Sequence, residues 1–138
     1  MTDRELINLA FSALENAYAP YSGFRVGAAL ECADGSVFLG CTVENASFGD
    51  TVCAERCAVV KAVSEGRREF RRIAVAAASG EYCLPCGSCL QVLREFSPDD
   101  MVILGVRGDG RYVSYKLSAL LPRTSIKSAM DELTQDSE

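Results

Sequence analysis

The spacing of apolar and polar residues along the chain predicts three helices, over residues 2–19, 51–65 and 85–96. In the first helix, apolar side chains recur at the three- and four-residue intervals of a helix that buries one face. Thr2 begins it, with Glu5 three residues later in the pattern of a capping box, and Pro20 ends it. Gly66 is placed to end the second helix.

Strand-like patterns follow in five segments, residues 26–33, 36–41, 73–78, 101–106 and 112–116. Asp34-Gly35 joins the first two in a hairpin, and a Gly-Asp-Gly turn joins the last two. The order helix, hairpin, helix, strand, helix, strand, strand predicts an α/β fold, a mixed sheet of about five strands with helices on both faces. We expect a single domain over residues 1–138, with a polar tail from about residue 123 that carries a short helix over 128–133.

The charge balance disfavours a polyanionic partner. The net charge is −5 and the pI about 4.8, whereas proteins that bind nucleic acids concentrate Lys and Arg on one face. The one dense basic run, residues 67–72, lies where a helix is expected to give way to a strand, so we interpret it as a solvated loop rather than a nucleic-acid site.

The N-terminal residues are polar and charged, unlike an apolar signal peptide, and no segment of the sequence is long and apolar enough to span a membrane. These features predict a cytoplasmic protein with no membrane partner.

Cysteine usage adds candidate chemistry, because the chain has seven Cys and no His. Reduced thiols in the cytoplasm are buried fillers, metal ligands or catalytic groups more often than disulfides. A transition-metal site must therefore be built from Cys, with Asp or Glu as the other possible ligands. Catalytic triads based on His and the His-Glu-x-x-His metalloprotease helix are excluded.

Two segments combine these thiols with a predicted helix start, Cys53-Ala54-Glu55 and Pro85-Cys86-Gly87-Ser88-Cys89. Free N–H groups and the helix dipole at a helix N-terminus favour the thiolate form. Cys86 and Cys89 lie on one face of a first turn and can chelate one ion, with Cys53 as a third ligand.

Three thiolates leave one open position on a tetrahedral Zn²⁺, which is typical of a catalytic site. Water in that position has a pKa of about 7. Glu55 is placed to exchange protons with this water, and Arg56 to offset the net charge of −1 that three thiolates and one zinc ion carry.

Other arrangements of the thiols stay open. Cys83 lies three residues before Cys86, and a closed site of four thiolates that includes it would be purely structural. Cys57, one turn after Cys53, is an alternative ligand or a buried filler. Cys86 and Cys89 alone would also fit a redox pair.

These motifs, in this order, make the chain resemble the small cytidine deaminase family over nearly its whole length. The two cysteine segments match the zinc deaminase signature, a first ligand, any residue, Glu, and then Pro-Cys-x-x-Cys. The other matching stretches are Pro20-Tyr21-Ser22-Gly23-Phe24, Val26-Gly27-Ala28-Ala29, Val43-Glu44-Asn45-Ala46-Ser47, Cys53-Ala54-Glu55-Arg56 and Gln91-Val92.

The resemblance implies hydrolytic deamination of cytidine and deoxycytidine to uridine and deoxyuridine, a reaction of pyrimidine salvage. A zinc-activated water attacks C4 of the pyrimidine, and Glu55 carries protons from that water to N3 and to the departing ammonia. The resemblance also implies a homotetramer that acts on a free nucleoside, with Phe24 stacked on the base and Glu44 hydrogen-bonded to the sugar.

Four positions depart from the family pattern, and Thr42 is the most relevant to the substrate because it replaces an Asn that helps to hold the sugar hydroxyl. Leu90 replaces an Arg, Phe48 a Tyr, and Ser125 an aromatic residue that reaches a neighbouring subunit's pocket. One alternative is therefore a deaminase of another cytosine-like compound, such as a nucleoside antibiotic or a modified nucleoside. Another is a non-enzymatic module, stabilised by structural zinc, that binds a partner or a nucleoside.

Overall fold

The predicted strands form one mixed sheet of five strands in the computed structural model, which describes residues 1–122. The strand order is β2-β1-β3-β4-β5. β3 and β4 are parallel, and the other neighbours are antiparallel. In chain order the elements are α1 (Asp3–Leu14), β1 (Val26–Cys32), β2 (Val37–Cys41), a 3₁₀ turn (Phe48–Asp50), α2 (Ala54–Ser64), β3 (Phe70–Ala77), α3 (Gly87–Glu95), β4 (Val102–Val106), β5 (Tyr112–Lys116) and α4 (Leu117–Leu120).

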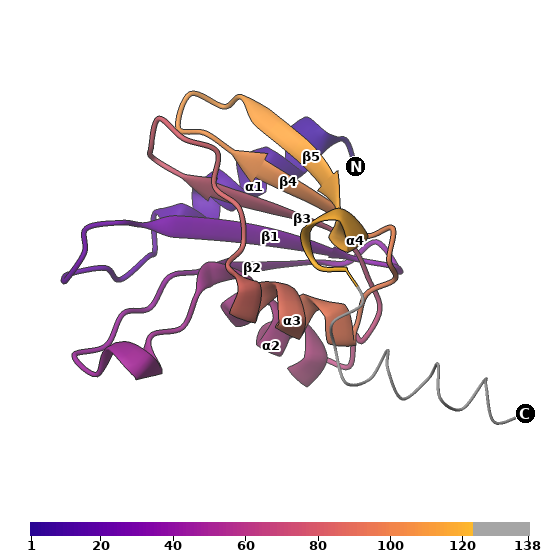
Figure 1. Ribbon diagram of the computed structural model, residues 1–138, viewed down its shortest axis with the longest axis horizontal. Coiled ribbons are helices and arrows are strands. Elements are labelled where there is room, and N and C mark those ends of the chain that lie inside the picture. Colours follow the sequence, from indigo (N-terminus) through magenta and orange to yellow (C-terminus); the bar gives the residue numbers. More distant parts are fainter. Residues whose placement is uncertain (123–138) are drawn as a thin grey trace, which may run out of the picture.

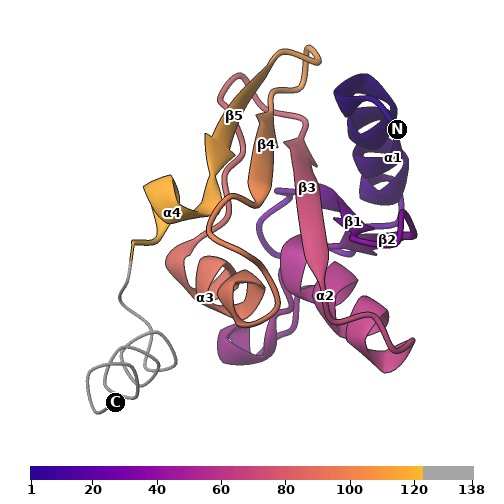
Figure 2. The ribbon, with the colours of Figure 1, turned by 90° about the vertical axis from the view of Figure 1, so that its right-hand side faces the viewer.

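Helices cover the sheet on both faces, as the sequence predicted (Figures 1 and 2). α1 packs on one face, and α2 and α3 lie next to each other on the other. Alternate strand residues therefore enter different cores. Leu30 and Val75 pack in the core beneath α2 and α3, whereas Ala29 and Ala74 pack in the core beneath α1.

Glycine in the strands lets a helix backbone lie directly on the sheet. A Cβ atom built at Gly40 of β2 would lie 2.3 Å from the carbonyl oxygen of Ala54 and 2.5 Å from the amide nitrogen of Ala58. Because Ala54 stands between Cys53 and Glu55, this close approach fixes the end of α2 that carries both of those side chains.

We therefore expect Gly40→Ala to displace the start of α2. Overpacking of this kind costs about 1–3 kcal/mol, so the free energy of unfolding in urea should fall by that amount and zinc content should fall with it. Gly80→Ala is the matched control, because a Cβ at Gly80 meets no atom within 4 Å. Equal stability of the two variants would contradict this account of the packing.

The first helix is shorter than predicted because its last residues pair elsewhere. α1 begins with the expected capping box at Thr2 but ends at Leu14. The Tyr18 amide donates to the carbonyl oxygen of Thr42, and the Glu44 amide donates to that of Tyr18, both at 2.8 Å. These bonds draw the loop after α1 toward the segment after β2.

Part of the basic run is not a solvated loop, and that prediction is wrong for Arg71 and Arg72, which belong to β3. The side chain of Arg72 is 14% exposed and forms ion pairs with Asp3 at 2.5 Å and Glu31 at 3.0 Å. The short helix expected over 128–133 lies outside the described residues. Within residues 1–122, no helix has the length and apolar character needed to cross a membrane.

Candidate active site

The two cysteine segments meet in a pocket of about 210 Å³ beside the N-terminal ends of α2 and α3. Its walls come from stretches that are distant in the sequence. The lining residues are Ser22, Phe24, Val26, Thr42, Glu44, Cys53, Ala54, Glu55, Cys83, Leu84 and Cys86. The pocket thus brings together residues that the sequence assigned separately to metal binding, proton transfer and substrate binding.

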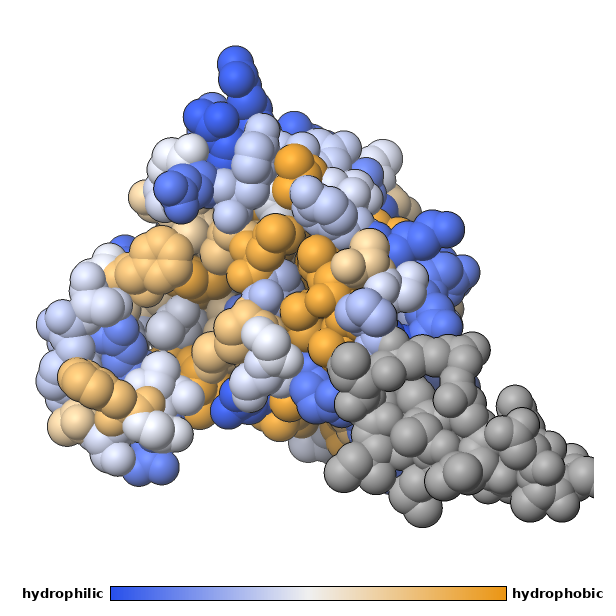
Figure 3. Space-filling model, in the orientation of Figure 1, coloured by the Kyte–Doolittle hydropathy of each residue, from blue (hydrophilic) through white to orange (hydrophobic). Residues whose placement is uncertain are grey.

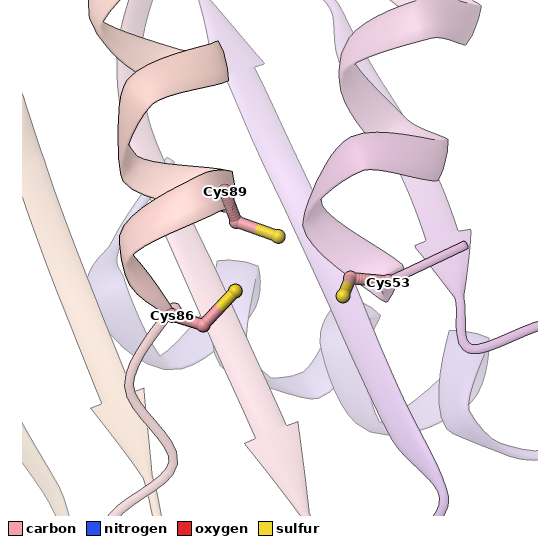
Figure 4. Close-up of side chains that lie close together, drawn as sticks. All are labelled: Cys53, Cys86 and Cys89. Atoms are coloured by element: carbon pink, nitrogen blue, oxygen red, sulfur yellow. The ribbon is translucent and has the colours of Figure 1, made fainter. Parts of the chain in front are cut away.

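Two of the lining residues, Cys53 and Cys86, bring their thiols together with that of the buried Cys89 (Figure 4). Cys53 caps the N-terminus of α2, Cys86 caps that of α3, and Cys89 follows in the first turn of α3. Their sulfur atoms point toward one another and all lie within 4.8 Å of each other. Among the described residues this is the one group of Cys, Asp and Glu side chains with a metal-binding arrangement.

The thiol environments differ. Burial raises the pKa of Cys53 and of Cys89, and the nearby Glu55 carboxylate adds to the effect. Burial also acts against ionisation of Cys86, but hydrogen bonds with the backbone N–H groups of Cys89 and Ser88 and with the Cys89 thiol lower its pKa overall. The helix N-terminus therefore favours one thiolate, and a divalent cation would favour all three.

The donor set fits Zn²⁺. Tetrahedral coordination with Zn–S bonds of about 2.3 Å needs sulfur atoms about 3.8 Å apart, so a cluster within 4.8 Å needs only slight closure. Cys53, Cys86 and Cys89 would hold the ion and leave one coordination position without a protein ligand. Such a site belongs to the catalytic type rather than the closed structural type.

Glu55 is a buried carboxylate beside this cluster. It lies in the first turn of α2 and is 5% exposed. Burial raises its pKa, and interactions with its own backbone, the Cys89 thiol and Arg56 oppose that shift. A carboxyl group whose pKa is raised holds its proton more readily than a free one, which suits a group that must both accept and donate a proton.

Arg56 connects the two helices that carry the thiols. Its Nη2 donates to Ser88 Oγ at 2.8 Å, and its positive charge partly opposes the rise in the pKa of Cys53 and Glu55 that burial causes. Its buried Nε has no hydrogen-bond partner among the described residues. An unpaired cationic donor at this place suits a cluster that carries excess negative charge once the thiols are ionised.

Cys83 does not join the cluster of three sulfur atoms, which argues against the closed site of four thiolates. It lines the pocket instead, and burial together with the Glu55 carboxylate raises its pKa to about 12, so this thiol stays neutral. Cys57 lines a different cavity with Cys41 and Lys61 and is not a substitute ligand.

Sequence reasoning gave no role to the pocket wall formed by Cys83 and Leu84. The Cys83–Leu84 segment crosses β4 at Gly105, where a Cβ would lie 2.6 Å from the Leu84 side chain and 2.8 Å from the Cys83 carbonyl oxygen. The sequence signal that could have indicated this role is that Cys83 and Leu84 directly precede Pro85-Cys86 in the chain. The missing side chain at Gly105 lets this segment deliver Cys86 to the site.

Phe24, Thr42 and Glu44 share the pocket with Glu55, as expected for substrate-binding residues. Phe24 is 50% exposed, and Thr42 is 9% exposed with its hydroxyl group donating to the Val26 carbonyl oxygen at 3.4 Å. Leu90, which stands where the family has an Arg, packs in the core beneath α2 and α3. Ser125 lies outside the described residues.

Comparison with known proteins finds a family model and sequence relatives that match most of the chain. Residues 1–105 match the family model described as the cytidine and deoxycytidylate deaminase zinc-binding region. The cytidine deaminase of Halalkalibacterium halodurans is 51% identical over 123 residues, which are 87% of this chain and 92% of that protein. That of Sporosarcina psychrophila is 42% identical over 122 residues, 88% and 90% of the two chains.

Solved structures agree with the sequence relatives. The crystal structure of cytidine deaminase from Burkholderia pseudomallei matches with a TM-score of 0.87 and 42% identity, covering 91% of this chain and 100% of that one. The cytidine deaminase from Mycobacterium tuberculosis matches with a TM-score of 0.77 and 37% identity, covering 89% and 97%. The fold of this chain is thus the fold of these solved cytidine deaminases.

Proposed function

This chain belongs to the cytidine and deoxycytidylate deaminase family, and from that premise we propose that it hydrolyses cytidine and 2′-deoxycytidine to uridine and 2′-deoxyuridine with release of ammonia. The observation that carries the proposal is the placement of Glu55, 5% exposed, in one pocket with Cys53 and Cys86, whose sulfur atoms lie within 4.8 Å of each other and of the Cys89 sulfur atom. A purely structural zinc module has no need of a buried carboxyl group at that position.

In the proposed mechanism Glu55 transfers protons between the attacking water and the substrate. Cys53, Cys86 and Cys89 would hold Zn²⁺, which would supply a bound water with a pKa of about 7. Glu55 accepts a proton from the attacking water and delivers it to N3 of the pyrimidine while the water oxygen bonds to C4. Glu55 then takes the remaining proton from the new C4 hydroxyl group and gives it to the amino group, so that the C4–N bond breaks, C4=O forms and ammonia leaves.

The outer part of the pocket holds the nucleoside. Phe24 presents its ring to the pyrimidine base, and Glu44 accepts a hydrogen bond from the sugar. Arg56 of α2, whose guanidinium group is hydrogen-bonded to Ser88 of α3, offsets the negative charge of the thiolates. The pocket has a volume of about 210 Å³.

A panel of aminopyrimidine nucleosides tests this function. We expect the zinc-loaded protein to release ammonia and form uridine from cytidine, measured by the fall in ultraviolet absorbance and by chromatography. Nucleosides of adenine and guanine serve as controls and should give no ammonia. Absence of ammonia from every cytosine-like nucleoside would refute the proposal.

Thr42 motivates a second candidate, deamination of a different cytosine-like nucleoside. The Thr42 hydroxyl group donates its hydrogen bond to the protein backbone. It therefore offers the sugar fewer hydrogen bonds, and a shorter reach, than the amide group of Asn would. We expect Thr42→Asn to raise kcat/KM for cytidine by about two- to tenfold, the effect of one neutral hydrogen bond. An unchanged value would show that Thr42 does not set the substrate preference.

We further propose a homotetramer that acts in pyrimidine salvage, as the family resemblance implies, and a cytoplasmic location, which the polar N-terminal residues favour. Exposed apolar side chains near the pocket support an assembly, among them Tyr21, Phe24, Val43 and Phe48. Figure 3 shows apolar surface over the two loops beside the pocket and over the middle of the same face. Light scattering should give four times the monomer mass of 14.8 kDa.

A further inference from the structure

Ser22 lies at the mouth of the pocket in a tight turn that carries Phe24. Gly23 adopts a positive φ of 72°, a conformation that L side chains rarely take, and its amide donates to the Ala19 carbonyl oxygen at 3.0 Å. This turn brings the Phe24 amide back to Ser22 Oγ, at 3.0 Å. The hydroxyl group of Ser22 thus holds the backbone of the residue proposed to stack on the base.

The same turn holds the carboxylate of Glu44. Glu44 Oε1 accepts from the Tyr21 amide at 3.0 Å and from the Ser22 amide at 3.2 Å. Glu44 Oε2 accepts from the hydroxyl group of Ser22. Phe24, Ser22 and Glu44 therefore form one chain of hydrogen bonds, in which each bond polarises the next.

These hydrogen bonds determine how many acceptor positions of the Glu44 carboxylate remain free for a ligand. A carboxylate oxygen accepts about two hydrogen bonds, so Oε1 is fully used by the turn and Oε2 has one position left. Ionised Glu44 donates none, and the nearby Thr42 hydroxyl group is engaged with the Val26 carbonyl oxygen. This end of the pocket therefore offers a strong acceptor for one hydroxyl donor.

We propose that Ser22 is a positioning residue that holds Phe24 and Glu44 in register, so that Glu44 Oε2 receives one ring hydroxyl of the nucleoside sugar. This inference rests on the proposed function, because it names how the same pocket recognises its substrate. It predicts that Ser22 controls the preference for a hydroxylated sugar and leaves the chemistry at C4 untouched.

The test compares cytidine with 2′,3′-dideoxycytidine, which lacks both ring hydroxyl groups. Ser22→Ala should reduce the wild-type preference for cytidine, the ratio of the two kcat/KM values, by about tenfold or more, the effect of weakening a hydrogen bond to a charged group. Ser22→Thr keeps a hydroxyl group and should stay within about threefold of wild type. Zinc content and Tm should not change.

Ser36→Ala is the matched control, because the Ser36 hydroxyl and amide groups both donate to Asp34 Oδ1 in the β1–β2 hairpin, among residues that do not line the pocket. It should leave the preference unchanged. In a Glu44→Gln background, Ser22→Ala should have no further effect on the ratio if Ser22 acts through Glu44.

Equilibrium binding separates this inference from the proposed function. Titration calorimetry with uridine and 2′,3′-dideoxyuridine should show the same loss of preference in Ser22→Ala, whether or not the protein turns over cytidine. An equal loss of affinity or kcat/KM for both sugars would overturn the role proposed for Ser22. Inactivity of the wild type, with the sugar preference in binding intact, would refute only the proposed function.

Discussion

Replacing Glu55 with Gln is expected to lower kcat for cytidine by about 10²–10⁴-fold, the usual contribution of general acid–base catalysis by one group. The amide has nearly the same shape as the carboxyl group but can neither take a proton from water nor deliver one to N3. Because Glu55 is buried beside Cys89 and is not part of the thiol cluster, the zinc content should remain at the wild-type level.

Steady-state kinetics and zinc analysis of the same preparation measure both effects. Glu65→Gln at the other end of α2 is the matched control, since Glu65 is exposed and distant from the pocket-lining residues in sequence. Retention of more than a tenth of the activity by Glu55→Gln would contradict the proton-transfer role. Loss of zinc would assign Glu55 to the metal instead.

Removal of one of the three clustered thiols should abolish activity together with metal binding. We expect Cys89→Ala to reduce bound zinc well below one ion per chain and to bring ammonia release below detection, because two thiolates hold the ion far less tightly than three. Cys89 is fully buried between the ends of two helices, so Tm should fall as well.

Cys83→Ala is the decisive comparison, because Cys83 lines the same pocket but lies outside the cluster. It should keep one zinc ion per chain and activity within about threefold of wild type, as expected when no ligand is lost. Elemental analysis after dialysis gives the metal content of both variants. Loss of zinc from Cys83→Ala would establish a closed site of four thiolates and remove the open position that catalysis requires.

Local chemistry could be predicted from the sequence because its geometry spans a few residues. Pro85 followed by two Cys three apart defines a chelating first turn of a helix whatever the rest of the chain does. In the same way, Asp34-Gly35 and the capping box at Thr2 specified a hairpin and a helix start. Hydrophobic patterning was then sufficient for the α/β class and the five-stranded mixed sheet.

Helix and strand ends were less predictable, because long-range partners decided them. The apolar spacing around Tyr18 fits a helix, yet pairing of its backbone with residues 42–44 ended α1 at Leu14. The sequence predicts Arg72 as a solvated cation in a loop. In the structure it forms ion pairs with Asp3 and Glu31, which are far away in sequence. Neither partner can be inferred from spacing along the chain.

The sequence by itself determined which residue types could bind a metal and move a proton, and it identified Glu55, the pair Cys86 and Cys89, and Cys53 as the expected third ligand, with Cys57 and Cys83 left as alternatives. Only the tertiary structure decided that Cys53, rather than Cys57 or Cys83, completes the cluster. The physical reason is that the thiols come from two helices, whose relative position depends on backbone contacts of α2 with Gly40 and of the Cys83–Leu84 segment with Gly105. Those contacts, like the bond from Ser22 to Glu44, exist only once the sheet has assembled.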